Sequence, residues 1–359
     1  MMFRAVVVIA CLCLGSGCFT MGYLVQAGAG QVDLIRRGKP IAEVVNDKSQ
    51  PRRVRWLLFQ VKHVKAWGQT RGLKPTQNYK RYSDLERAAA VWVVQGCAPL
   101  EFSVRRWEFP IVGTVPYLGF FKEADAKAYA EKLAKEEKLD VAVRGAQAYS
   151  TLGWFNDPVL STMLGSGPEA VGDLAETILH ESVHATVYVP GQSWFDESLA
   201  SFIAEGLTPD FLAERFGADS DISRAYAEGQ ARSERFGKEL HATYDALDKV
   251  YKSSVTDEAK RAEKQRILEG LRDTLGMKRV LNNASLAGSK TYATGQGGFQ
   301  RLRAACGSWD KFLGAVATLK TGDFGKPQQE NFEPVLDELA ERECGAKPGV
   351  QNPKVERAY

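Results

Sequence analysis

The sequence lacks several features that would place it in other classes of protein. Its 47 basic and 44 acidic residues leave a net charge of only +3 over 359 residues. No basic patch is interleaved with aromatic residues, so nucleic acid is not indicated as a partner. No internal repeat and no low-complexity linker divides the chain. The absence of repeats and linkers favours one compact domain. A chain of 359 residues is long enough to bury a substantial hydrophobic core.

Residue types that bind transition metals are also scarce. The chain has four histidines and six cysteines, and no Cys-x-x-Cys pair occurs in it. Structural zinc sites usually draw on such cysteine pairs, so a site of that kind is not indicated. Histidine is then the only strong sign of a metal site. Two of the four histidines, His180 and His184, lie four residues apart.

The N-terminus has no apolar run long enough to span a bilayer. Residues 5–14 form a short apolar segment after one positive charge, and Gly15-Ser16-Gly17 follow before Cys18. This pattern predicts a secretory signal peptide of residues 1–17. It also resembles a bacterial lipoprotein signal, which implies that Cys18 is the lipid attachment site and the mature N-terminus. The usual leucine three residues before the cysteine is Gly15 here, and plain secretion or an uncleaved anchor are the alternatives.

The remaining cysteines allow at most one disulfide bond. Two of the six cysteines fall in the expected signal segment, and Cys18 is expected to carry lipid. Cys97, Cys306 and Cys344 are left, and one of these must stay unpaired. Cys306 and Cys344 flank a helical C-terminal segment and are the expected pair. Three reduced cysteines are the alternative, because an oxidising compartment permits a disulfide without requiring one.

The hydrophobic pattern predicts an α+β fold that is predominantly helical, with a small mixed sheet ahead of the two histidines. The main domain is expected to comprise residues 18–345, followed by a frayed tail of residues 346–359. Residues 107–121 are expected to form an ordered loop, and residues 281–299 another loop region. The expected helices are residues 32–46, 52–68, 123–138, one beginning near Asp196, an antiparallel pair within 209–276, and one or two within 300–340. The expected strands are residues 89–95, 100–104, 140–144 and 148–155.

The central motif is His180-Glu181-x-x-His184, within a run that reads as a helix. Residues four apart share one face of a helix, so both imidazoles can face one metal ion. Glu181 is offset by about 100° and can reach a water on that metal without being a ligand. This is the arrangement of zinc hydrolases. The helix is expected to be capped by Asp173, with Glu176 as its capping-box partner, and to be ended by Pro190-Gly191. The alternative is a surface helix that binds nothing.

Catalytic zinc needs a third protein ligand and an open position for water. Glu197 and Glu205 are the nearest candidates after the motif, because His241 is far along the chain. Glu197 follows His184 by thirteen positions, which leaves room for a turn and the start of a second helix. Residues 195–202 resemble the Asn-Glu-x-x-Ala element of gluzincins, which implies Glu197 as the ligand. The residue before the glutamate is Asp196 here, where asparagine is usual.

With zinc bound, Glu181 would act as general base and then general acid. A side chain must also stabilise the oxyanion, and Tyr292 is the first choice, with His241 and Tyr149 as alternatives. In gluzincins an extended segment before the metal helix pairs with the substrate, which implies that role for residues 149–155; an ordinary core strand is the alternative. Glu205 and Asp157 are candidates for holding a free amino terminus.

Several segments together resemble the family of predicted bacterial zinc aminopeptidases, whose members are typically lipoprotein-like. The resemblance implies a zinc metallopeptidase that hydrolyses peptides from the amino end. It covers nearly the whole mature chain, at residues 26–31, 110–121, 148–164, 180–184, 196–200 and 282–286.

We therefore expect an enzyme that uses Zn²⁺ and a peptide substrate and sits in the bacterial cell envelope, facing the periplasm or the exterior. The lipid anchor would make the membrane a partner, and the sequence identifies no protein partner. One alternative is a non-catalytic envelope lipoprotein that keeps a peptidase fold as a binding module. Another is a zinc amidase or endopeptidase with a different substrate.

Overall fold

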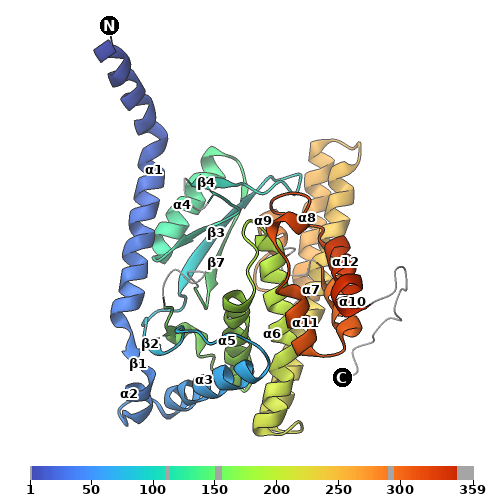
Figure 1. Ribbon diagram of the computed structural model, residues 1–359. Helices are drawn as coiled ribbons and strands as arrows, with labels where there is room; N and C mark the ends of the chain where they lie inside the picture. Colours follow the sequence, from blue (N-terminus) through green and yellow to red (C-terminus); the bar gives the residue numbers. More distant parts are fainter. Residues whose placement is uncertain (1, 110–112, 150–155, 290–294, 346–359) are drawn as a thin grey trace.

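The computed structural model describes residues 2–109, 113–149, 156–289 and 295–345, with the side chains of residues 2–18, 288 and 289 left aside. This part of the chain is mostly helical with small sheets, so the predicted α+β class is confirmed (Figure 1). The helices are α1 Met2–Arg37, α2 Ile41–Asn46, α3 Arg52–Thr70, α4 Glu123–Glu136, α5 Ala170–Thr186, α6 Ser193–Phe216, α7 Asp221–Lys252, α8 Asp257–Thr274, α9 Asn283–Ser289, α10 Gln296–Cys306, α11 Trp309–Val316 and α12 Glu333–Cys344.

The strands form three small sheets. In the first, β2 pairs antiparallel with β1 and parallel with β8. In the second, β3 lies between β6 and β7, with Val94 opposite Leu118 on one side and Val143 on the other. The third is a hairpin of β4 and β5. The strands are β1 Lys39–Pro40, β2 Arg81–Ser83, β3 Val91–Cys97, β4 Trp107–Phe109, β5 Gly113–Val115, β6 Leu118–Phe120, β7 Asp140–Ala146 and β8 Val159–Leu160.

Two predictions about the strands are wrong. Residues 100–104 form no strand beside β3, and an isolated bridge between Cys97 and Val104 is the pairing seen there among the described residues. Residues 107–121 are not a loop, because β4, β5 and β6 lie within them. Trp107, Phe109, Leu118 and Phe120 are buried at every second position, and they pack in one hydrophobic cluster with α4. These strands are only three residues long, and the prolines and glycines between them obscured this alternation.

Three predictions about the helices also need correction. The expected helix of residues 32–46 is interrupted by β1, where Pro40 precedes α2. The expected boundary at Pro209 lies inside α6, whose residues on both sides of Pro209, such as Leu207 and Phe211, are buried in the main core. The expected loop of residues 281–299 contains α9 and the start of α10. The predicted helices at residues 52–68 and 123–138 correspond to α3 and α4, and the predicted pair to α7 and α8.

The main core surrounds α5. Leu174, Ile178, Leu179 and Val183 are at most 1 % exposed and contact residues of α3 and α6. These positions recur every three to four residues, so they line one side of the helix. In Figure 1, α5 lies in the middle of the molecule, between the sheets and the long helix α6. The helix that carries the two histidines is therefore held from several directions.

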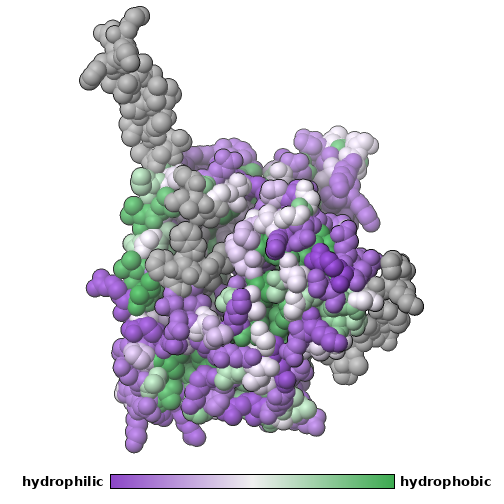
Figure 2. All heavy atoms as spheres, viewed as in Figure 1, coloured by the Kyte–Doolittle hydropathy of each residue, from purple (hydrophilic) through white to green (hydrophobic). Residues whose placement is uncertain are grey.

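At the N-terminal end, α1 extends beyond the body of the molecule (Figure 1). Apolar residues on its outer side remain exposed, among them Met21, Val25 and Val32. Figure 2 shows apolar side chains along the coloured part of this helix, beside the body of the molecule. Among the described residues, no helix combines the length and the apolar character needed to cross a membrane. Cys18 lies within α1, and its expected lipid modification remains a prediction.

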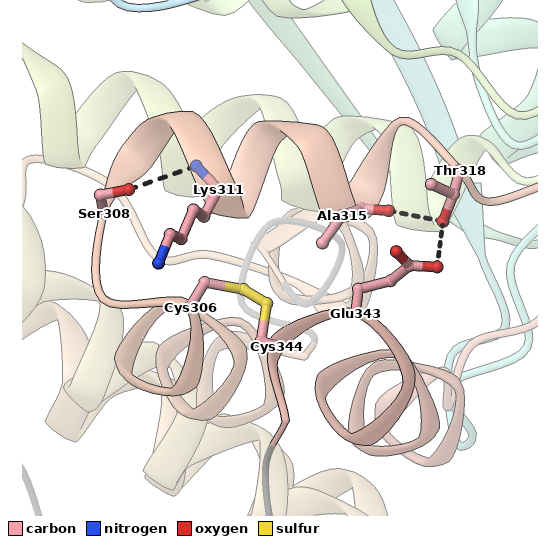
Figure 3. The surroundings of a disulfide bond; sticks show 7 residues. All are labelled: Cys306, Ser308, Lys311, Ala315, Thr318, Glu343 and Cys344. Carbon is pink, nitrogen blue, oxygen red and sulfur yellow. Dashed lines mark hydrogen bonds between the residues drawn. A yellow bond between two sulfur atoms is a disulfide. The ribbon is translucent and has the colours of Figure 1, made fainter.

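A disulfide bond joins Cys306 at the end of α10 to Cys344 at the end of α12, as expected from the sequence (Figure 3). Their Cα atoms are 4.7 Å apart. Next to it, Thr318 donates hydrogen bonds to the Ala315 carbonyl and the Glu343 carboxylate. Cys97 is buried and unpaired. Burial raises the pKa of its thiol to about 12, so this cysteine is inert at neutral pH.

Replacing both Cys306 and Cys344 by serine should lower the free energy of unfolding by about 2–4 kcal/mol. The bond closes a loop between residues 38 positions apart, and losing it restores that freedom to the unfolded chain. Urea unfolding with and without a reducing agent measures the effect. The reductant should destabilise the wild type and leave the double variant unchanged. Equal unfolding midpoints for the oxidised wild type and the double variant would contradict a stabilising role.

Candidate metal centre

The start of α5 differs from the sequence prediction. The helix begins at Ala170 after Glu169, and Asp173 lies in its first turn without capping it. Glu176 does not complete a capping box, because its carboxylate accepts hydrogen bonds from the Tyr226 hydroxyl and the Gln230 amide, both at 2.6 Å. At the other end α5 stops at Thr186, four residues before Pro190. Packing against α7, rather than a local cap, therefore fixes the first turns of the helix.

Three side chains meet between α5 and α6. His180 and His184 project from α5 and Glu197 from the second turn of α6. The two imidazole Nε2 atoms are 3.2 Å apart. The Glu197 carboxylate lies 3.4 Å from Nε2 of His180 through one oxygen and 3.6 Å from Nε2 of His184 through the other. The structure thus brings together the two histidines and the third ligand that the sequence favoured.

These distances fit a tetrahedral metal ion. Two atoms that each bind zinc at about 2.0–2.2 Å lie about 3.3–3.6 Å apart in tetrahedral geometry. The two Nε2 atoms are 3.2 Å apart, and the Glu197 carboxylate lies 3.4 Å from one of them and 3.6 Å from the other through its two oxygens, so these distances are close to that range. The two nitrogens and one carboxylate oxygen are also a ligand set typical of catalytic zinc. His180, His184 and Glu197 therefore have the identity and the spacing to hold such an ion.

The charge states of the three residues follow from burial and from their mutual contacts. Burial lowers the pKa of His184 to about 4, against an opposing effect of Glu197, so its imidazole is neutral at pH 7 and available as a ligand. Burial would also lower the pKa of His180, but the hydrogen bond and the charge of Glu197 outweigh it and raise that pKa. For Glu197 the same contacts outweigh burial and lower the pKa. The site therefore keeps a carboxylate between two imidazoles.

Two neighbours on α6 complete the surroundings of the histidines. The Ser201 hydroxyl lies 3.5 Å from Nδ1 of His180, on the far side of the ring from Glu197. Asp196 accepts a hydrogen bond from the Val189 amide at 2.9 Å, which ties the turn between α5 and α6. Its other oxygen is buried with no partner among the described residues, and burial raises its pKa to about 7. Asp196 thus supports the turn before Glu197.

The other ligand candidates lie elsewhere. His241 is exposed on α7 and 3.6 Å from the Asp245 carboxylate. Glu205 lies two turns beyond Glu197 on α6, outside the group of three. It lines an open cleft of about 440 Å³ one turn of α5 away from His180. The cleft also carries Glu169, Asp173 and Glu176, with Arg232 from α7.

Asp173, in this cleft, should make the free energy of unfolding depend on pH. Burial, and then the charges of Glu176 and Glu169, raise its pKa to about 6. A carboxyl group with a raised pKa favours folding below its unfolded pKa of about 4, and this contribution is lost as the pH rises through about 6. Asp173→Asn should therefore unfold at higher urea than the wild type at pH 8, by less than about 1 kcal/mol because the group is partly solvated. If the variant and the wild type differed in stability by the same amount at pH 4 and at pH 8, the raised pKa of Asp173 would be contradicted.

The remaining predicted residues are placed as follows. Glu181, the predicted base, is half-buried on α5 and is not part of the ligand group. Tyr149 packs edge-on against Phe121 at the main core. Asp157 is buried, and its backbone amide donates to the Asn78 side chain. Tyr292 and most of the expected substrate strand, residues 150–155, lie outside the described residues.

One residue beside the site, Ser201, was not predicted from the sequence. Ser201 follows Glu197 by four positions, so the helical repeat could have placed it on the same face.

The fold and the site together define an α+β protein with a candidate metal centre built from two adjacent helices. The family model described as putative aminopeptidase matches residues 22–331, and the chain belongs to that family. No curated protein matches the chain, and no solved structure matches it.

Proposed function

We propose that this protein is a zinc-dependent peptidase, with His180, His184 and Glu197 as the zinc ligands. The observation that carries the proposal is the close approach of the two imidazole Nε2 atoms and the Glu197 carboxylate, at distances near those of tetrahedral coordination. Membership of the putative aminopeptidase family supports peptide hydrolysis independently of that geometry. When bound, zinc would supply a Lewis acid that polarises the substrate carbonyl and favours deprotonation of water.

The chain's own residues divide the remaining work. Glu181 follows His180 directly, so its carboxylate points about 100° away around the helix axis. In this position Glu181 accepts the proton of the attacking water and passes it to the leaving amine, as general base and then general acid. If His180 binds metal through Nε2, its Nδ1 carries the proton and faces the Ser201 hydroxyl at 3.5 Å, which can accept that hydrogen bond. Tyr292 is the residue predicted to stabilise the oxyanion.

We further propose that the enzyme is an aminopeptidase. The family description supports this specificity. The acidic cleft lies one turn of α5 from His180, and its carboxylates favour a cationic group such as a free amino terminus. An endopeptidase would instead have to bind a continuing, uncharged peptide chain in this acidic cleft, which its carboxylates do not favour.

We also propose that the protein is exported and held at the envelope by lipid on Cys18. The apolar segment and the small residues before Cys18 support this location. Cys18→Ser should release the protein from the membrane fraction of the bacterial host. Retention of the variant in that fraction would contradict a lipid anchor at this residue.

A panel of aminoacyl substrates and internally quenched peptides tests the function, with Glu181→Gln as the control. We expect zinc-dependent release of amino-terminal residues by the wild type and no turnover by the variant. Hydrolysis of the quenched peptides alone would replace the aminopeptidase by an endopeptidase. A protein that binds zinc and cleaves neither class would favour the alternative of a binding module or an amidase.

A further inference from the structure

Helix α1 has an apolar face that remains exposed over the part whose side chains are described, residues 19–37. At about 100° per residue, seven apolar or glycine residues of this part fall within about 140° of the helix circumference and extend over about four turns. They form the outer face of α1, which consists of Met21, Leu24, Val25, Gly28, Ala29, Val32 and Ile35. Every one of them is exposed, with Met21 at 65 %, Val25 at 64 % and Val32 at 53 %.

The opposite side of the helix is fixed to the body of the molecule. The Tyr23 hydroxyl accepts from the Gly119 amide at 3.1 Å, and the Gln26 side chain donates to the Gly119 carbonyl at 3.0 Å. One turn and more further on, Leu34 is 1 % exposed, and its carbonyl accepts from the Ser83 hydroxyl at 2.7 Å. These contacts tie α1 to β2 and β6. The helix therefore cannot rotate to bury its outer face in the core of the same molecule.

The charges of this part of α1 lie at its C-terminal end. Residues 19–37 contain three charged side chains, Asp33, Arg36 and Arg37. Asp33 is paired with Arg37 at 2.9 Å, so its negative charge is compensated. Arg36 is exposed and follows Val32 by four positions, which places it at the end of the outer face. An apolar helix face that ends in a positive charge suits a bilayer with anionic headgroups.

A second copy of the chain is the other occupant to weigh, because steps of three and four residues also occur in coiled coils. There the positions that flank the apolar seam usually carry charges that select the partner. Leu24 and Ala29 occupy two such flanking positions here, and Gly28, in the middle, has no side chain to insert into a partner helix. Upstream, the same helix continues into the apolar residues 5–14. A broad apolar face without pairing charges favours fluid acyl chains over a specific helix.

We propose that the outer face of α1 lies on the surface of a lipid bilayer, with the helix axis along the membrane plane and Arg36 at the level of the headgroups. The contact would fix one orientation of the protein body relative to the membrane. This inference rests on the proposed envelope location for the presence of a membrane, but it does not require lipid on Cys18.

The first test measures contact with lipid at single positions of the full chain. A fluorescent amino acid replaces Val25, Val32 or Val255 in turn, and each protein is placed with vesicles of phosphatidylethanolamine and phosphatidylglycerol that contain a nitroxide-labelled lipid. Val255 is the matched control, because it is a valine with 50 % exposure between α7 and α8, which lie on the other side of the molecule from α1 (Figure 1). The nitroxide should quench positions 25 and 32 at least about threefold more than position 255, since a surface-bound helix places its apolar face among the upper acyl chains.

The second test changes the outer face itself. With the fluorescent residue at position 21, the double variant Val25→Glu/Val32→Glu should lose most of the quenching, because it places two carboxylates against acyl chains. Val255→Glu should leave the quenching unchanged. All three valines are exposed, so the urea midpoints of these variants should stay at that of the wild type.

Equal quenching at positions 25, 32 and 255 would overturn the proposal. Contact of the outer face between two protein copies, with no quenching by lipid, would assign this face to a dimer and overturn it as well. Mass spectrometry shows separately whether Cys18 carries lipid, and Cys18→Ser is read with the same vesicles. A wild type absent from the membrane fraction would refute the proposed location, and the added vesicles would still decide whether the outer face binds lipid.

Discussion

Glu181→Gln is expected to lower kcat/KM by about 10²- to 10⁴-fold while the protein keeps its zinc. Glutamine has nearly the shape of glutamate but cannot accept the proton of the attacking water at neutral pH. Glu181 is not one of the three clustered donors, so the metal site should survive the substitution. Steady-state kinetics and elemental analysis of the same preparation measure both quantities.

Glu131→Gln is the matched control for this experiment. Glu131 is exposed on α4, a helix whose buried residues belong to a different hydrophobic cluster from those of the metal helix. The same chemical change there should therefore leave kcat/KM and zinc content unchanged. Normal peptidase activity of Glu181→Gln would exclude Glu181 as the base.

Removing one of the three metal ligands should weaken zinc binding itself, whereas removing Glu181 should affect proton transfer and leave zinc bound. His184→Ala and Glu197→Gln are each expected to weaken zinc binding by more than about 100-fold, because loss of a mere outer partner of a ligand already costs 10- to 100-fold. His184 is only 7 % exposed, so water cannot easily replace its imidazole. Competition against a chromophoric chelator gives the dissociation constants.

Two variants at the rejected ligand candidates serve as controls. Glu205 lies in the acidic cleft and His241 is exposed on α7, and neither belongs to the group of three. Glu205→Gln and His241→Ala should therefore keep the zinc affinity of the wild type. If Glu205→Gln lost zinc while Glu197→Gln retained it, the assignment of the third ligand would be wrong.

The parts of the site that follow a helical repeat were predictable from the sequence. His180 and His184 share a face because they are one turn apart, and a short turn places Glu197 opposite them. The general fold class followed from the same periodicity. The capping roles predicted for Asp173 and Glu176 were wrong. Asp173 is affected by neighbouring carboxylates, and Glu176 accepts hydrogen bonds from α7, so neither side chain caps the helix start.

Features that depend on contacts between distant segments escaped prediction. The strands β4, β5 and β6 are three residues each, too short for a two-residue alternation to stand out. The left-handed backbone of Tyr79 is accompanied by hydrogen bonds of Tyr79 and Asn78 with Asp157, which lies far along the chain. A local pattern cannot anticipate a conformation that tertiary contacts impose.

The zinc content of the purified wild-type protein at neutral pH tests the central claim most directly. Elemental analysis and calorimetric titration of the chelator-treated protein should both give one zinc ion per chain, and peptide hydrolysis should return in proportion to the zinc added. The site formed by His180, His184 and Glu197 has the donors and the spacing for this result. A protein that binds no stoichiometric zinc under these conditions, or that hydrolyses peptides equally well without it, would contradict the account.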